Sequence, residues 1–150
     1  MIEIIEVTFE NLNDLVAVEL ASMPYEERTD GFDPSYKDLF ELWNSRIFFN
    51  SHVAFLLKHE GKVKGMLGMC TPVYKGFINA LYIAPDNFKQ GFGRKLIEKA
   101  AQITLQNGGN CLYVEVQKHN FRALNFYNRL HFIKTQVKST HLIELKKELI

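Results

Sequence analysis

The chain has almost no excess charge, few cysteines and no long run of apolar residues. Its 150 residues carry a formal net charge of +1, so they offer no broad positive field for nucleic acid and no polybasic patch for a membrane surface. A helix that crosses a bilayer needs about 20 consecutive apolar residues, and no stretch of the sequence approaches that length. We therefore expect neither nucleic acid nor a membrane among its partners.

The chain also lacks the patterns of a metal site and of a secreted protein. Its two cysteines, Cys70 and Cys111, lie far apart in strand-like surroundings, where buried free thiols are more common than a disulfide. The five histidines form no pair at metal-ligand spacing, so we expect no metal. Residues 1–6 lack the basic start and cleavage site of a signal peptide. These absences favour the reducing cytoplasm.

The order of apolar patterns predicts one domain over residues 1–150. An apolar content of 47% is enough for one good core. Alternating and helical spacings indicate a mixed α/β fold (α+β type), with a central mixed, mostly antiparallel sheet flanked by about four helices. The expected strands are residues 2–8, 53–59, 62–74, 77–83, 111–117, 132–137 and 141–146, and the expected helices are residues 9–22, 36–49, 92–106 and 120–130.

A glycine turn between a strand and a helix, residues 83–96, is the first candidate site. Arg94 and Lys95 fall in the first turn of the helix, where cations are disfavoured unless an anion is bound. Gly91 and Gly93 allow a sharp turn and a close approach of backbone to a phosphate or pyrophosphate. Leu96 replaces the third glycine of a dinucleotide fingerprint, and the chain has no Walker triplet. A glycine-rich turn with solvated cations explains the same residues.

An expected strand at residues 112–117 is followed by Asn120, Ala123, Phe126, Tyr127, Arg129 and Phe132. These residues match the last block of the GNAT acetyltransferase superfamily, Asn-x-x-Ala-x-x-Phe/Leu-Tyr-x-Lys/Arg-x-Gly-Phe, which residues 112–132 therefore resemble. The glycine turn then resembles the coenzyme A loop of that family, Arg/Gln-x-x-Gly-x-Gly/Ala. Three positions depart from the pattern: Phe88 stands in place of Arg or Gln, Lys89 where glycine is common, and His131 in place of the last glycine.

The resemblance implies an N-acetyltransferase that moves an acetyl group from acetyl-CoA, its co-substrate, to a primary amine by direct attack. The pantetheine arm would pair with the strand before the glycine turn, and the pyrophosphate would lie on the N–H groups of the turn. Asn120, Ala123 and Tyr127 share one helix face, which would look towards the thioester. The implied coenzyme A residues are Leu81, Tyr82, Ile83, Lys89, Gln90, Gly91, Phe92, Gly93, Arg94, Lys95, Asn120, Ala123 and Tyr127.

The resemblance makes Tyr127 the general acid, although a core tyrosine fits its surroundings as well. The base is less defined. Glu115 points away from the apolar side of its strand and lies twelve positions before Tyr127. This arrangement resembles the branch that acetylates protein N-termini, where such a glutamate is the base. A structural glutamate, or a water chain that starts near Asn79 or Tyr82, remains an alternative.

The acceptor is the least defined part of the prediction. The acidic loop after the first helix would suit a cationic amine, and a solvated loop explains it equally. We expect a small-molecule amine, with a protein or peptide N-terminus as the first alternative. A non-catalytic acyl-CoA-binding module is the alternative from another class, and a homodimer stays open. The acidic residues of the loop are Glu26, Glu27, Asp30 and Asp33.

Overall fold

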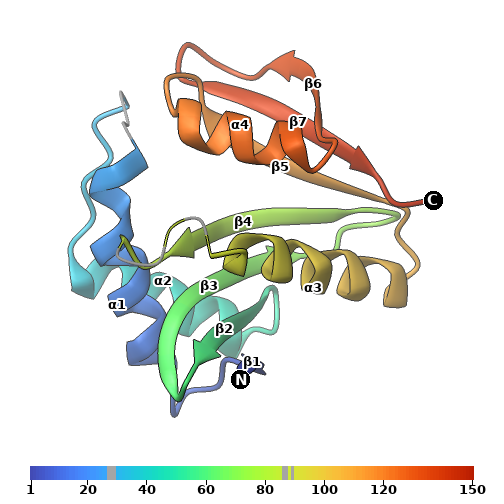
Figure 1. Ribbon diagram of the computed structural model, residues 1–150. Helices are drawn as coiled ribbons and strands as arrows, with labels where there is room; N and C mark the ends of the chain where they lie inside the picture. Colours follow the sequence, from blue (N-terminus) through green and yellow to red (C-terminus); the bar gives the residue numbers. More distant parts are fainter. Residues whose placement is uncertain (27–29, 86–87, 89) are drawn as a thin grey trace.

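A computed structural model describes residues 1–26, 30–85, 88 and 90–150 (Figure 1). Over these residues the chain forms a seven-stranded sheet in the order β1-β2-β3-β4-β5-β7-β6, with four α-helices. The predicted mixed, mostly antiparallel sheet flanked by helices is confirmed. The elements are β1 (Ile2–Glu6), α1 (Leu12–Ser22), the short 3-10 helix η1 (Met23–Glu26), α2 (Tyr36–Phe48), β2 (Val53–His59), β3 (Lys62–Cys70), β4 (Gly76–Ile83), α3 (Phe92–Gln106), β5 (Cys111–Gln117), α4 (Phe121–Arg129), β6 (Ile133–Val137) and β7 (Leu142–Glu148).

Two of the predicted boundaries differ from the observed ones by three residues or more. The first helix begins at Leu12 rather than at residue 9, because the chain first makes a turn in which the Thr8 N–H donates to Asn11 Oδ1 (2.7 Å). Strand β3 ends at Cys70, four residues earlier than expected, two positions before Pro72, which has no N–H to donate to a ladder. The spacing of apolar residues does not reveal such a turn or the effect of a proline, so it does not predict these two boundaries.

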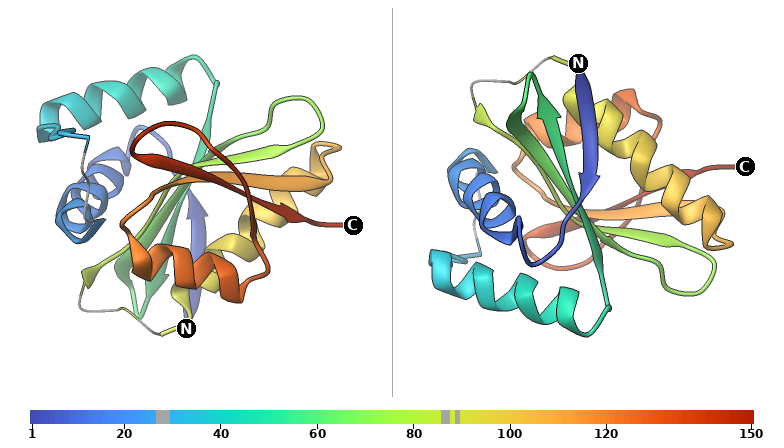
Figure 2. Two further views of the ribbon diagram at one scale, coloured as in Figure 1. Left: turned by 90° about the horizontal axis from the view of Figure 1, so that it is seen from above. Right: turned by 90° about the horizontal axis from the view of Figure 1, so that it is seen from below.

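Helices cover both faces of the sheet, and each face has its own apolar core. The α3 and α4 helices cover one face, where Leu96 packs with Leu67 of β3. The α1 and α2 helices cover the other, where Leu15 packs with Leu56 of β2. The two views of Figure 2 show the helix pairs on opposite sides of the sheet. This arrangement explains why β2 is almost continuously apolar, since successive side chains point to opposite cores.

Strands β4 and β5 form a parallel pair that is very short. They pair only over residues 76–78 of β4 and 112–114 of β5. Beyond this point β4 carries a bulge. On β3, Gly68 and Met69 are consecutive, but their partners on β4, Ala80 and Ile78, are separated by one extra residue. Asn79 is the extra residue. The two strands then diverge towards their carboxyl ends, as Figure 1 shows.

Trp43 of α2 is packed directly against the bulged part of the sheet. Its side chain is fully buried, and its indole N–H donates to Glu19 Oε1 of α1 (2.7 Å). The ring lies on Gly68, where an added Cβ would come within 2.1 Å of the indole Cη2 atom. Glycine is therefore required at position 68 by the close approach of the ring.

We expect Gly68→Ala to lower the free energy of unfolding by about 1–3 kcal/mol, because the new methyl group must displace a buried indole. Urea unfolding monitored by circular dichroism measures the change. The matched control is the same substitution in a Trp43→Phe background, where the smaller ring leaves room for the methyl group. The cost of Gly68→Ala should be smaller in that background; an equal cost in both backgrounds would contradict the proposed clash.

Candidate active site

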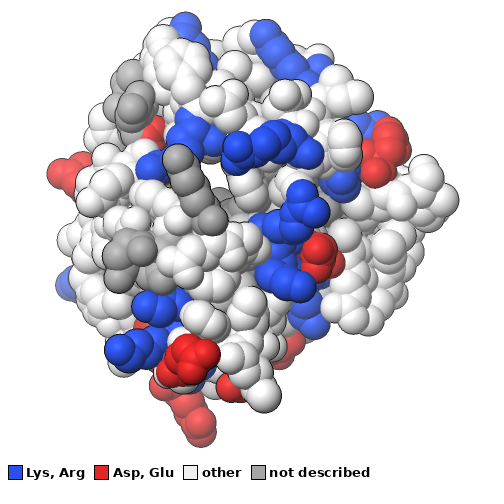
Figure 3. All heavy atoms as spheres, in the orientation of Figure 1, with Lys and Arg blue, Asp and Glu red and all other residues white. Residues whose placement is uncertain are grey.

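A cleft of about 670 Å³ opens where β4 and β5 diverge. Its walls come from both strands, from η1, from the beginning of α3 and from α4. Arg94, Arg122 and Arg129 are among the lining residues. Figure 3 shows Lys and Arg side chains gathered around a hollow on this face of the molecule. One part of the cleft is therefore suited to an anionic ligand.

The glycine turn brings the beginning of α3 to the cleft. Gly91 has φ +79°, a left-handed conformation that favours glycine, and it precedes the first residue of the helix. Among the described residues no side chain caps this helix end, and its first turn holds no acidic residue. Its free N–H groups are thus available to an anion, and Arg94 adds charge beside them.

The structure gives Gly93 a packing role that the sequence did not suggest. A Cβ at this position would lie 2.9 Å from the Cε1 and Cζ atoms of Phe126. Gly93 therefore permits close contact between α3 and α4 in addition to lining the cleft. Of the predicted loop residues, Gln90 and Phe92 also line the cleft, Lys95 does not, and Lys89 lies outside the described residues.

Strand β4 presents its outer edge to the cleft. Leu81, Tyr82 and Ile83 line it, and they lie beyond the three residue pairs that join β4 to β5. One edge of β4 is hydrogen-bonded to β3, and no strand pairs with the other edge at these residues, where the Ile83 carbonyl accepts from the Ser22 hydroxyl (3.2 Å). Such an edge can pair with an extended amide-bearing ligand.

Tyr127 lies on the α4 wall of the cleft and is only 5% exposed. Phe126 and Phe132 pack edge-on against its ring, each with ring centroids 5.0 Å away. Burial, and to a smaller extent the negative charge of Glu26, raises the pKa of the phenol above its ordinary value. The hydroxyl is therefore protonated at neutral pH and is able to donate a proton or hydrogen bond.

Asn120 places the residues of α4 that face the cleft. Its side-chain Oδ1 accepts from the Ala123 N–H (3.3 Å) and so caps the helix. Asn120, Ala123 and Tyr127 all line the cleft, which agrees with the shared face expected from their spacing. His131 follows α4 with φ +70°, the left-handed conformation expected for the residue that replaces glycine there.

Glu115 lines the cleft from β5 and is half-buried. It has no hydrogen bond or ion pair with a described residue. Its cross-strand neighbour is Glu144 of β7. Burial raises the pKa of Glu144, but hydrogen bonds from Thr135 and Gln136, with the charge of Lys138, outweigh this effect and lower it overall. Glu115 therefore lies beside a carboxyl group that the protein favours in its ionised form.

Tyr82 and Glu26 form a contact that sequence analysis did not find. The Tyr82 hydroxyl donates to Glu26 Oε1 at 2.7 Å, and both residues line the cleft. They are 56 positions apart, so only the fold brings them together. Of the other acidic residues of the loop, Asp30 contacts Gln117, Asp33 is exposed, and Glu27 lies outside the described residues.

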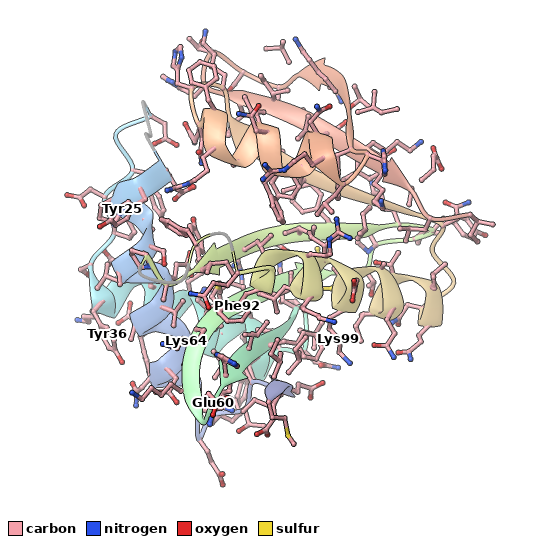
Figure 4. All side chains as sticks on the ribbon, viewed as in Figure 1. Tyr25, Tyr36, Glu60, Lys64, Phe92 and Lys99 are labelled. Carbon is pink, nitrogen blue, oxygen red and sulfur yellow. The ribbon has the colours of Figure 1, made fainter. Side chains whose placement is uncertain are left out.

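Phe88, the main departure from the coenzyme A loop pattern, takes part in a cluster across the mouth of the cleft. The Arg122 guanidinium lies over its ring, with Cζ 4.0 Å from the centroid, and the Tyr25 ring meets it edge-on at 5.8 Å. Arg122 Nη2 also donates to the Tyr25 carbonyl (2.9 Å). Figure 4 shows Tyr25 close to the end of α1 and Phe92 where α3 begins. The cluster joins η1, the glycine turn and α4.

Two general findings concern metals and membranes. In the part of the chain that the structure describes, no group of three or more His, Cys, Asp or Glu residues is arranged to hold a metal ion. None of the described helices combines the length and the apolar character needed to cross a bilayer.

Comparison with known proteins identifies the family of this chain. The sequence pattern of the Acetyltransferase (GNAT) family matches residues 15–132. Over 132 residues the chain is 26% identical to thialysine N-epsilon-acetyltransferase of Bos taurus, and the match covers 81% of this chain and 69% of that protein.

Solved structures of acetyltransferases have the same fold as this chain. An acetyltransferase from Thermus thermophilus superposes with a TM-score of 0.85 at 22% identity, covering 99% of this chain and 97% of that one. The PaiA N-acetyltransferase from Thermoplasma acidophilum, solved in complex with coenzyme A, has a TM-score of 0.82 at 18% identity and covers 99% of both chains. The chain thus belongs to the GNAT acetyltransferase family, a class of acyl-CoA-dependent transferases, and the resemblance seen in its sequence is confirmed.

The buried phenol of Tyr127 makes stability depend on alkaline pH. The folded protein favours the neutral form, so its stabilising effect is complete below the ordinary tyrosine pKa of about 10 and is lost as the pH rises further. Between about pH 9 and pH 11 the Tm of Tyr127→Phe should therefore fall less than that of the wild type. The control Tyr74→Phe, at a side chain 74% exposed, should follow the wild type. Parallel curves for wild type and Tyr127→Phe would contradict the prediction.

Proposed function

We propose that this protein is an N-acetyltransferase that transfers an acetyl group from acetyl-CoA to a primary amine of a small molecule, with Tyr127 as general acid. The observation that carries the proposal is the meeting of three features in one cleft. These are the unpaired edge of β4, the uncapped beginning of α3 and a buried, protonated phenol. Each one suits a different part of an acyl-CoA.

The binding of acetyl-CoA follows from these features. The N–H groups that follow Gly91 and the Arg94 guanidinium would hold the pyrophosphate. The β4 edge at residues 81–83 would pair with the amides of the pantetheine arm. This pairing directs the thioester towards the α4 wall, where Tyr127 lies. Bound acetyl-CoA supplies an activated acetyl group.

The transfer itself requires three proton movements. A base takes a proton from the ammonium form of the acceptor, which predominates near neutral pH. The free amine then forms the new C–N bond as the C–S bond breaks, and its nitrogen loses a second proton to water in the cleft to give the neutral amide. Tyr127 gives its proton to the departing sulfur and regains one from solvent through the cleft. Its raised pKa keeps the phenol in the acid form that this step needs.

Glu115 is the base that we propose. It lines the cleft, is half-buried and has no described ion-pair partner that would compete for its charge. The hydrogen-bonded pair of Tyr82 and Glu26 is the second candidate, because its carboxylate lies close enough to influence Tyr127 electrostatically. A water between either carboxylate and the amine would extend its reach.

The acceptor and the compartment complete the proposal. The bovine relative is named for thialysine, a small amine, and the acidic residues beside this cleft suit the same class. A peptide N-terminus is the alternative within the enzyme class. We place the protein in the cytoplasm, because Cys70 and Cys111 are free thiols.

Release of coenzyme A thiol in the presence of acetyl-CoA and a panel of small amines and short peptides tests the proposed activity. With an accepted amine, Tyr127→Phe should lower kcat by about a hundredfold or more, because it removes only the donating hydroxyl. Tyr74→Phe should keep normal turnover. If acetyl-CoA binds but no acceptor causes release of coenzyme A thiol, the protein is a non-catalytic acyl-CoA-binding module. Full activity of Tyr127→Phe would show that Tyr127 serves only as a core residue.

The pH dependence of kcat/KM identifies the base. Glu115→Gln should lower kcat/KM and remove the acidic limb that belongs to the free enzyme, while the melting temperature is retained. Glu98→Gln, at an exposed position of α3, is the matched control and should keep the limb. If Glu26→Gln rather than Glu115→Gln removes the limb, the base is the pair formed with Tyr82. If Glu115→Gln keeps the acidic limb but has a lower melting temperature, the role of Glu115 is structural.

A further inference from the structure

Gln117, the last residue of β5, holds a buried acceptor atom that has no partner among the described residues. The side chain is 4% exposed and lines the cleft. Its Nε2 donates to Asp30 Oδ2 at 3.2 Å. A carboxylate only accepts hydrogen bonds, so the amide nitrogen must face Asp30 and the carbonyl oxygen must face away. This Oε1 atom is buried, and no described residue donates a hydrogen bond to it.

Asp30 holds the amide of Gln117 in this orientation. Its other carboxylate oxygen, Oδ1, accepts from the Phe32 N–H at 3.0 Å, so the carboxylate is anchored by backbone of its own loop. Donation from the Gln117 amide to a negative group also makes the opposite carbonyl oxygen a stronger acceptor. The arrangement thus fixes a buried, polarised oxygen on a residue that lines the cleft.

Buried acceptors in native proteins nearly always have a partner, so a ligand is the natural source of the missing N–H. Glu115 lies two residues earlier on the same strand and therefore on the same side of it. Glu26 lines the cleft from η1, and Asp30 lies behind Gln117. These three carboxylates make a cationic nitrogen the preferred donor.

We propose that Gln117 Oε1 accepts a hydrogen bond from a second, cationic nitrogen of the acceptor, so that the substrates of this enzyme are diamines. One amine reacts at the thioester and the other is held by Gln117. This inference rests on the proposed acetyl transfer. Gln117 is then a specificity residue, and Asp30 is a positioning residue that acts through it.

The test compares 1,4-diaminobutane with butylamine, which has the same carbon chain and a single nitrogen. The diamine has two equivalent amines, so its kcat/KM is first divided by two. After this correction the wild type should favour the diamine by about tenfold or more in kcat/KM, because bound butylamine leaves the buried Gln117 oxygen unpaired. Gln117→Leu should lose most of this preference. Gln102→Leu, the same substitution at an exposed position of α3, should keep it.

Asp30→Asn is a second variant that preserves size and folding. The amide oxygen introduced at position 30 should still accept the hydrogen bond from the Phe32 N–H. The introduced NH2 group should then face Gln117. Gln117 would then turn its oxygen to that group and offer NH2 to the cleft, where it opposes a cation. The preference for the diamine should fall as in Gln117→Leu, mainly through KM. Melting temperatures and calorimetric coenzyme A affinity verify that both variants fold.

The outcomes separate this inference from the proposed function. Equal use of both amines by the wild type, or an unchanged preference in Gln117→Leu, would overturn it, as would a short peptide that is preferred over the diamine and depends on Gln117. If no acceptor causes release of thiol from acetyl-CoA, the proposed acetyl transfer is wrong. Calorimetric titration of the coenzyme A-bound protein with the same two amines then decides the second-nitrogen site: tighter diamine binding that is lost in Gln117→Leu supports it, and equal binding overturns it.

Discussion

The short parallel pairing of β4 with β5 is the constraint on which the site depends. Only three residue pairs join the two strands before the bulge at Asn79 turns β4 away. On the face of the sheet that α1 and α2 cover, Trp43 packs on Gly68 and so supports β3 next to this bulge. A regular sheet would use both edges of β4 for its own ladder. Divergence instead leaves one edge unpaired and opens a cleft that both apolar cores border.

The cleft is chemically uneven, and this unevenness suits a two-substrate reaction. The beginning of α3, with Arg94 in its first turn, makes one part electropositive. Carboxylates from η1 and β5, with Gln117 held by Asp30, make another part rich in acceptors. Tyr127 is buried on the wall that the two parts share, where low dielectric keeps its proton in place. Opposite charges of the two ligands would thus guide them to different ends.

Much of the fold and part of the site could be predicted from the sequence, because the signals are local. The 3.6-residue spacing of apolar positions sets α3, and the Ser35–Asp38 capping box sets the start of α2. Gly91 needs a left-handed φ that is readable from its place in the turn. The placement of Tyr127 on the same face as Asn120 follows from helical geometry.

By itself the sequence determined the order of elements, the glycine turn and the helix face that carries Tyr127, since each depends on residues within a few positions of one another. Only the tertiary structure decided which distant residues meet. The contact of Glu26 with Tyr82 spans 56 positions, that of Asp30 with Gln117 spans 87, and that of Arg122 with Tyr25 spans 97. Long-range contacts of this kind depend on how strands diverge and helices pack, and no local spacing encodes them.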